Sequence, residues 1–431
     1  MNTQLSKQIK AYYKKNFPKK TFIPGVSPVP VSGKVFDEKE LISGVSAVLE
    51  GWWTEGRFAQ EFEKAFAKLL GVRYVSLTNS GSSANLIAFS ALTSKRLGER
   101  AIKKGDEVIT AACGFPATVN PIIMSGCIPV FVDIDLKTKN VKLSEIKKAL
   151  TKKTKAIMIA HTLGNPFAVS EIADFAKKHN LWLIEDCCDA LYAQYDSKFV
   201  GTFGDIATFS FYPAHQITMG EGGAAITNNP LLHIAVRQFR DWGRDCWCDT
   251  GKDNTCGKRF GWKLGDLPLG YDHKYTYSQI GYNLKLTDMQ AALGLAQLEK
   301  LPEFVKARRK NFSSLYSFFK QHEKYFILPE KETKANPSWF GFMLIVGKNA
   351  PFTKNELVEF LESKKIATRG LFAGNILKHP AYKNITYRKI GALQNSDYIM
   401  NSGFWIGVYP GLTTEMITYV KKQIKIFLAA K

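Results

Sequence analysis

Seven short apolar runs rich in β-branched residues alternate with segments that have the apolar period of an α-helix, and this alternation most constrains the fold. The runs occupy residues 74–79, 107–112, 128–135, 155–161, 181–188, 206–213 and 223–228. Because helical segments connect successive strands, the connections are crossovers and the strands lie mostly parallel. The pattern predicts an α/β fold with helices on both faces of the sheet and a ligand site beyond the carboxyl ends of its strands.

The patterning divides the chain into three regions. Residues 1–37 combine a lysine-rich helical stretch with an extended segment broken by prolines. Residues 38–301 carry the alternating pattern and form the predicted large domain. One helix is expected over 287–320, and the less regular pattern beyond it predicts a smaller C-terminal α+β domain at 302–431.

The net charge alone does not decide which class of partner the protein binds. The 431-residue chain has a formal charge of +21, which attracts nucleic acid, anionic membranes and anionic small molecules alike. The charge is scattered, and no zinc-finger or helix-turn-helix pattern accompanies it. No run reaches the roughly 18 apolar residues of a membrane span, and the N-terminus lacks a signal-peptide core. We therefore expect a cytoplasmic protein without nucleic-acid or membrane partners.

Polar groups follow several of the predicted strands. The turn SGSSAN at 80–85 opens a helix and could cradle a phosphate, although such turns also cap helices without a ligand. Phe115 could stack on a planar ligand or belong to the core. Asp186 ends an apolar strand, where a carboxylate needs a cation, a proton donor or structural hydrogen bonds.

The order of these groups, with the later SFYP strand and GEGG turn, resembles the sugar-aminotransferase branch of the fold type I pyridoxal-phosphate enzymes over nearly the whole chain. The resemblance implies that Asp186 pairs with the pyridine nitrogen of the cofactor. The other implied cofactor contacts are Gly81, Ser82, Phe115, Ser210 and Asn283. Asn283 lies in GYNLKLTDMQAA, which resembles the family segment whose asparagine reaches the phosphate of the neighbouring subunit, so the resemblance implies a homodimer.

His215 stands where this family has the lysine that holds the cofactor covalently, and no lysine occurs between Phe199 and Gly251 to replace it. An imidazole cannot form that bond but remains an acid/base near neutrality. An inactive protein is one interpretation. The other is the sugar 3-dehydratase subgroup, which has this replacement. There, pyridoxamine 5′-phosphate, or noncovalent pyridoxal phosphate, reacts with a 4-keto sugar, and the histidine takes a proton from C4′ of the cofactor so that the C3 hydroxyl leaves.

Four cysteines form the pattern C-x57-C-x-C-x7-C, namely Cys188, Cys246, Cys248 and Cys256. Four thiolates suit a structural zinc or an iron–sulfur cluster. The CWC pair is closer than usual zinc pairs, and Cys188 lies two residues after Asp186, near the predicted cofactor ring. The spacing also resembles that of the [2Fe–2S] 3-dehydratases that make 3,6-dideoxyhexoses, with 244–275 as the cluster-binding insert.

The remaining cysteines receive other interpretations. Cys187 competes with Cys188 as a ligand but points to the opposite face of its strand, and spacing favours Cys188. Cys113 and Cys127 are expected to be small buried side chains.

The resemblance implies the reaction and its partners. The substrate would be a nucleotide-linked 4-keto-6-deoxyhexose, CDP-linked by overall likeness, and an NADH-dependent flavin/iron–sulfur reductase would supply electrons through the cluster. Arg369 in RGLFAGN is a candidate clamp for the diphosphate, or a solvated surface arginine. The alternatives are a cluster-free dehydratase that consumes an amino donor, a sugar-nucleotide aminotransferase-like protein, and a noncatalytic binding protein of the same fold.

Overall fold

The structure, a computed structural model, describes residues 3–431 and contains a central eight-stranded sheet. Its strands are β1 (Tyr74–Thr78), β2 (Glu107–Ala111), β3 (Ile128–Val132), β4 (Thr154–Ala160), β5 (Trp182–Asp186), β8 (Ile206–Ser210), β9 (Gly223–Thr227) and β13 (Arg388–Lys389). They lie in the order β1-β9-β8-β5-β4-β2-β3-β13. β9 runs antiparallel to β1 and β8, and the other neighbours are parallel, which confirms the predicted mostly parallel sheet.

Helices cover both faces of this sheet, so its strands are buried on both sides. The helices concerned are α3 (Arg57–Leu70), α4 (Gly81–Leu92), α5 (Pro116–Met124), α6 (Leu143–Ala149), α7 (Val169–Lys178) and α8 (Pro230–Arg240). On β4, Ala156 and Met158 join the cluster formed with α4, α5 and α8. Ile157 and Ile159 join the cluster that contains α3, α6 and α7. Successive side chains point to opposite faces of the sheet, and both faces are buried. The strands therefore appear in the sequence as continuous apolar runs.

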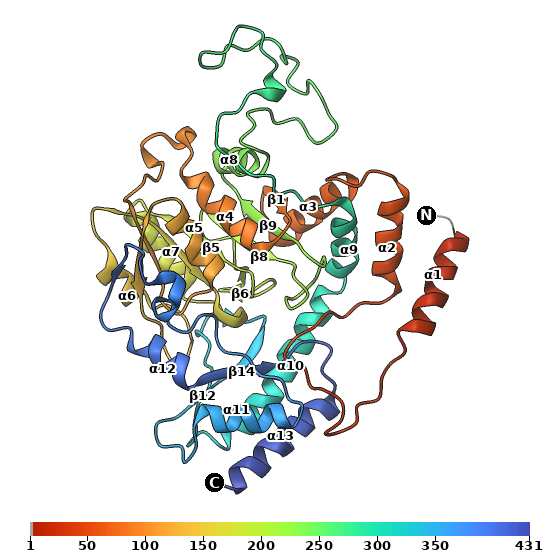
Figure 1. Ribbon diagram of the computed structural model, residues 1–431, viewed down its shortest axis with the longest axis vertical. Helices are drawn as coiled ribbons and strands as arrows, with labels where there is room; N and C mark the ends of the chain where they lie inside the picture. The colour runs from red at the N-terminus through yellow and green to blue at the C-terminus, as the bar shows by residue number, and fades with distance from the viewer. Residues whose placement is uncertain (1–2) are drawn as a thin grey trace.

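The C-terminal part of the chain forms a second apolar cluster. It contains the sheet of β10 (Phe326–Ile327), β12 (Gly341–Val346) and β14 (Gly403–Gly407), with α10 (Leu301–Lys320), α11 (Lys354–Ser363) and α13 (Thr414–Ala429). In Figure 1 these elements gather at the end of the molecule away from α8. The domain boundaries at residues 37 and 301 remain predictions.

The prediction of one helix over 287–320 is wrong. The segment forms α9 (Asp288–Leu298) and α10, with a break at residues 299–300. Pro302 occupies the first turn of α10 and has no N–H to donate, so a helix begins there more readily than it continues through.

The remaining elements lie around this core. They are α1 (Thr3–Asn16), α2 (Glu38–Leu49), α12 (Gln394–Ser402) and the small sheet of β6 (Gln194–Tyr195), β7 (Lys198–Phe199) and β11 (Ala335–Asn336). The cysteine-bearing connection, residues 241–287 between α8 and α9, is largely irregular and projects away from the body of the molecule (Figure 1). Across residues 3–431, each helix is too short or too polar to cross a bilayer.

Candidate cofactor and active site

Asp186 ends β5 and is fixed by neutral donors. Its side chain is almost fully buried. Oδ2 accepts hydrogen bonds from Asn85 Nδ2 at 2.8 Å and Thr118 Oγ1 at 2.6 Å, and Oδ1 accepts one from the Cys188 N–H at 3.1 Å. A carboxylate has about four acceptor sites. The three protein donors therefore orient Asp186 and leave capacity for one further donor, such as a protonated ring nitrogen.

The predicted phosphate contacts meet at the start of α4. The Ser80 side chain caps this helix by accepting the Ser83 N–H at 3.1 Å. A Cβ atom on Gly81 would lie 2.4 Å from Ser210 Cβ and 3.1 Å from Cys188 Sγ, so these three residues are close neighbours. The first N–H groups of a helix have no intrahelical acceptor and attract anions. The observed cradle fits a phosphate, with Ser82 at its exposed side.

We expect Gly81→Ala to weaken cofactor binding because the added methyl group has no room beside Ser210. The same overlap should lower the free energy of unfolding by about 1–3 kcal/mol. Pyridoxamine phosphate retention on gel filtration and urea unfolding measure the two effects. Gly370→Ala is the matched control, since a Cβ there meets open space. Full cofactor retention by Gly81→Ala would show that the cradle lies elsewhere.

His215 lies in the turn after β8 and is held by its backbone. Its N–H donates to Tyr212 O at 3.0 Å, and its carbonyl accepts from Arg308 at 2.8 Å. The imidazole Nδ1 lies 3.6 Å from Asp189 Oδ1, and the ring tilts against Phe340 with centroids 5.2 Å apart. Burial and the Arg308 charge lower the pKa of His215 to about 3. The imidazole is therefore neutral at neutral pH, and its protonated form needs a nearby negative charge to stabilise it.

Asp189 and Arg308 were missed by the sequence reasoning. Asp189 is 9% exposed, and burial beside Asp186 raises its pKa to about 7. A second carboxylate in EDCCDA, just past a strand end, was the available signal for Asp189. Arg308 is fully buried in α10 and contacts the His215 backbone across 93 positions of sequence, so no local pattern marks it.

Three other predicted contacts lie on exposed surface. Phe115, at the N-terminus of α5, is 48% exposed, so the alternative that it belongs to the core is wrong. Asn283 is exposed within the cysteine-bearing connection. Arg369 is exposed, pairs through its backbone with Trp405, and donates one guanidinium N–H to Thr368 O at 2.7 Å. The roles of these residues remain predictions.

The four predicted metal ligands fall into two groups. Cys188 lies in the cradle beside Gly81. In the cysteine-bearing connection, the side chains of Cys246 and Cys248 contact each other, and Cys248 Sγ accepts the Thr255 N–H at 3.3 Å, next to Cys256. Among residues 3–431, these sulfurs do not form a group of three or more within 4.8 Å of one another. The two groups are thus presented separately by β5 and by the connection.

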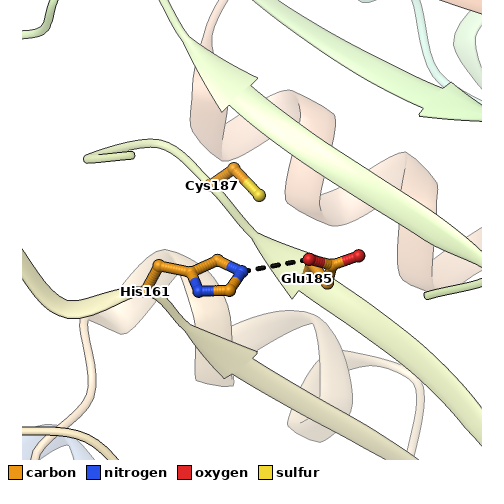
Figure 2. A group of neighbouring side chains, drawn as sticks. All are labelled: His161, Glu185 and Cys187. Atoms are coloured by element: carbon orange, nitrogen blue, oxygen red, sulfur yellow. Dashed lines mark hydrogen bonds and ion pairs between the residues drawn. The ribbon is translucent and has the colours of Figure 1, made fainter. Parts of the chain in front are cut away.

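One compact cluster of ligand-type residues lies on the other face of β5 and consists of His161, Glu185 and Cys187 (Figure 2). His161 Nε2 lies 3.1 Å from Glu185 Oε2, and His161 Nδ1 accepts the Phe167 N–H at 3.3 Å. Glu185 also accepts three backbone N–H groups from residues 201–204. Because the imidazole and the carboxylate are already hydrogen-bonded within the protein, the cluster supports the end of β5 structurally. The Cys187 thiol belongs to this cluster, whereas Cys188 Sγ lies beside Gly81.

The sheet topology, the strand-end aspartate and the phosphate cradle define a fold type I pyridoxal-phosphate enzyme. The chain belongs to the DegT/DnrJ/EryC1/StrS aminotransferase family, which it matches over residues 36–425.

Its relatives include sugar 3-dehydratases. The chain is 56% identical over 427 residues to the lipopolysaccharide biosynthesis protein RfbH of Salmonella typhimurium, covering 99% of this chain and 98% of the relative. It is 52% identical to a dTDP-4-dehydro-2,6-dideoxy-D-glucose 3-dehydratase of Saccharopolyspora spinosa, covering 95% and 88%. Among solved structures, E. coli GDP-4-keto-6-deoxy-D-mannose-3-dehydratase with bound hydrated PLP is 31% identical, with a TM-score of 0.83 and coverage of 92% and 98%.

Proposed function

We propose that the protein catalyses C3 dehydration of a nucleotide-linked 4-keto-6-deoxyhexose with noncovalent pyridoxamine 5′-phosphate. The preferred substrate is CDP-4-keto-6-deoxy-D-glucose, which makes the activity that of a CDP-6-deoxy-4-hexulose 3-dehydratase in cytoplasmic synthesis of O-antigen 3,6-dideoxyhexoses. The observation that carries the proposal is His215, a neutral and largely enclosed imidazole beside Asp189 in the turn after β8, where the resemblance places the family's lysine. The 3-dehydratase relatives support this assignment.

We assign the contacts with the cofactor ring and with its phosphate to residues in and around the cradle. Asp186, oriented by Asn85 and Thr118, would hold the ring nitrogen. The exposed Phe115 ring would cover the cofactor ring. The phosphate would be held by Gly81, Ser82 and Ser210, with Asn283 from a second copy. When bound, the cofactor supplies an electron sink through its protonated ring.

His215 carries out the proton transfer in this proposal. Its Nδ1 lies 3.6 Å from Asp189 Oδ1, so an ionised Asp189 would favour the tautomer with the proton on Nδ1 and leave the lone pair of Nε2 free to take the proton from C4′. Asp189 then stabilises the imidazolium that forms. Arg308 holds the His215 carbonyl and so fixes the position of the imidazole relative to Asp186. The departing C3 hydroxide leaves without any redox step.

The cysteines would hold a [2Fe–2S] cluster, which would supply one-electron transfer chemistry when bound. We propose Cys188, Cys246, Cys248 and Cys256 as its ligands, and Cys188 is favoured over Cys187 because Cys187 faces the His161 side of β5. Hydrogen bonds from Thr255 and Cys246 outweigh burial and lower the pKa of Cys248, which favours the thiolate that metals bind. An NADH-dependent flavin/iron–sulfur reductase would donate the electrons.

A homodimer is also proposed. Large apolar side chains in the cysteine-bearing connection are exposed, and they are Trp242, Trp247, Phe260, Leu269, Tyr271, Tyr275, Tyr277, Ile280 and Tyr282. Ile280 is 95% exposed. Exposed apolar surface of this extent is typical of protein interfaces. A second copy that covers the connection would also receive Asn283.

Product analysis tests the proposed function. With CDP-4-keto-6-deoxy-D-glucose, pyridoxamine phosphate, NADH and reductase under anaerobic conditions, we expect a nucleotide sugar that has lost its C3 hydroxyl and kept its C4 ketone. Mass spectrometry and NMR identify this product. A C4-amino sugar that retains the C3 hydroxyl and requires an amino-acid donor would instead define an aminotransferase.

A further inference from the structure

Lys285 lies at the end of the cysteine-bearing connection with its ammonium group enclosed by its own chain. The side chain is only 10% exposed. Nζ lies 3.2 Å from Asn283 Oδ1, 3.4 Å from Asp241 Oδ1 and 3.7 Å from the centre of the Trp242 ring. Two of the three N–H donors of the ammonium group are directed at these oxygens, and the Trp242 ring covers one side of the group. Groups of its own chain therefore fix the position of the Lys285 ammonium.

This contact determines which way the Asn283 amide faces. An ammonium group only donates, so the amide must turn its oxygen, and not its nitrogen, toward Lys285. The Nδ2 group of the same amide then faces away from Lys285, and Asn283 is exposed. A phosphate only accepts hydrogen bonds. Lys285 thus selects the amide orientation that presents donors to a phosphate.

A buried ion network anchors Lys285 in place. Its partner Asp241 accepts from Arg240 Nε at 2.9 Å, and Arg240 also pairs with Glu55 at 2.6 Å. The Arg240 guanidinium is almost fully buried. The backbones of Asp241 and Asn283 pair in an antiparallel bridge. The amide is therefore braced through its side chain and through its backbone.

We propose that Lys285 is a positioning residue that locks the Asn283 amide with its NH₂ group outward, ready for the cofactor phosphate of a second copy of this chain. The proposal rests on the homodimer and the Asn283 contact described under the proposed function. A neutral, apolar side chain at 285 releases the amide to rotate. Such a substitution should lower cofactor affinity and leave catalysis unaffected, because His215 and Asp186 are unchanged.

The test measures the pyridoxamine phosphate dissociation constant of the intact protein by equilibrium dialysis. Lys285→Met should weaken binding about tenfold, with kcat at saturating cofactor unchanged. Lys285→Arg, which keeps a cation beside Trp242, should restore most of the affinity. In an Asn283→Ala background, Lys285→Met should cause no further loss. Lys178→Met, at an exposed lysine that ends α7 outside the connection, is the control and should bind as the wild type does.

Equal weakening by Lys285→Met in both backgrounds would overturn the proposal, since Lys285 would then act without Asn283. Unchanged affinity in Lys285→Met would overturn it as well. Sedimentation velocity on each variant separates these results from a loss of the dimer. If Asn283 does not contact the cofactor phosphate of a second copy, Asn283→Ala alone should leave cofactor affinity unchanged. This result distinguishes failure of the proposed Asn283 contact from failure of the Lys285 proposal. A wrong sugar substrate does not alter any of these binding measurements.

Discussion

Replacing Cys248 with alanine should abolish the 3-deoxy product formed with NADH and a flavin reductase, while elimination at C3 continues. In the proposed reaction, removal of the C4′ proton and departure of hydroxide are heterolytic steps, so His215 and the cofactor would suffice for them. Reducing the unsaturated sugar requires two electrons. The chain has no GxGxxG nucleotide fingerprint, so in the proposed function a separate reductase supplies these electrons through the cysteine-bound cluster.

Two measurements separate these steps. Mass spectrometry of the nucleotide sugar reports the 3-deoxy product, and exchange of ¹⁸O from water into C3 reports reversible elimination with pyridoxamine phosphate alone. In Cys248→Ala the first signal should vanish and the second persist. Iron and acid-labile sulfide should be lost in parallel.

The two thiols that directly follow β5 provide a matched pair of variants. Cys188→Ala should lose iron as Cys248→Ala does, whereas Cys187→Ala should retain it, because Cys187 faces the His161 cluster. Full product formation by Cys248→Ala, or by the wild type without a reductase, would contradict the electron-transfer role. Zinc in place of iron would then point to a structural metal.

The sheet could be predicted from the sequence because its strands are buried on both faces. Each of the seven apolar runs coincides with a strand to within a few residues, and β4 (Thr154–Ala160) begins one residue before the run at 155–161. The antiparallel direction of β9 was not visible, since a buried run reads alike in either direction. Pro302 is a sequence signal for the break before α10, but the helical apolar period continues on both sides of it and favours one long helix.

The site could be predicted where it depends on strand ends and not where it depends on distant contacts. Gly81 and Asp186 follow or end strands, so topology alone brings them to one edge of the sheet. The approach of Asp189 to His215 depends on the path of the turn after β8. The contact of Arg308 with that turn depends on how α10 packs, which no local pattern records.

The central claim is that His215 is the base at C4′, and His215→Asn is expected to retain pyridoxamine phosphate while turnover falls about 100-fold or more. Asparagine keeps the backbone contacts to Tyr212 and Arg308, because these involve only the N–H and C=O of residue 215. It cannot accept a proton at neutral pH. His179→Asn, at an exposed histidine after α7, is the control and should retain full activity.

The most direct measurement is the rate at which solvent deuterium enters C4′ of bound pyridoxamine phosphate in the presence of the 4-keto sugar. The account predicts rapid incorporation by the wild type and by His179→Asn, and a rate about 100-fold or more lower in His215→Asn at the same cofactor occupancy. Equal incorporation by the wild type and His215→Asn would contradict it, because another group would then remove the C4′ proton.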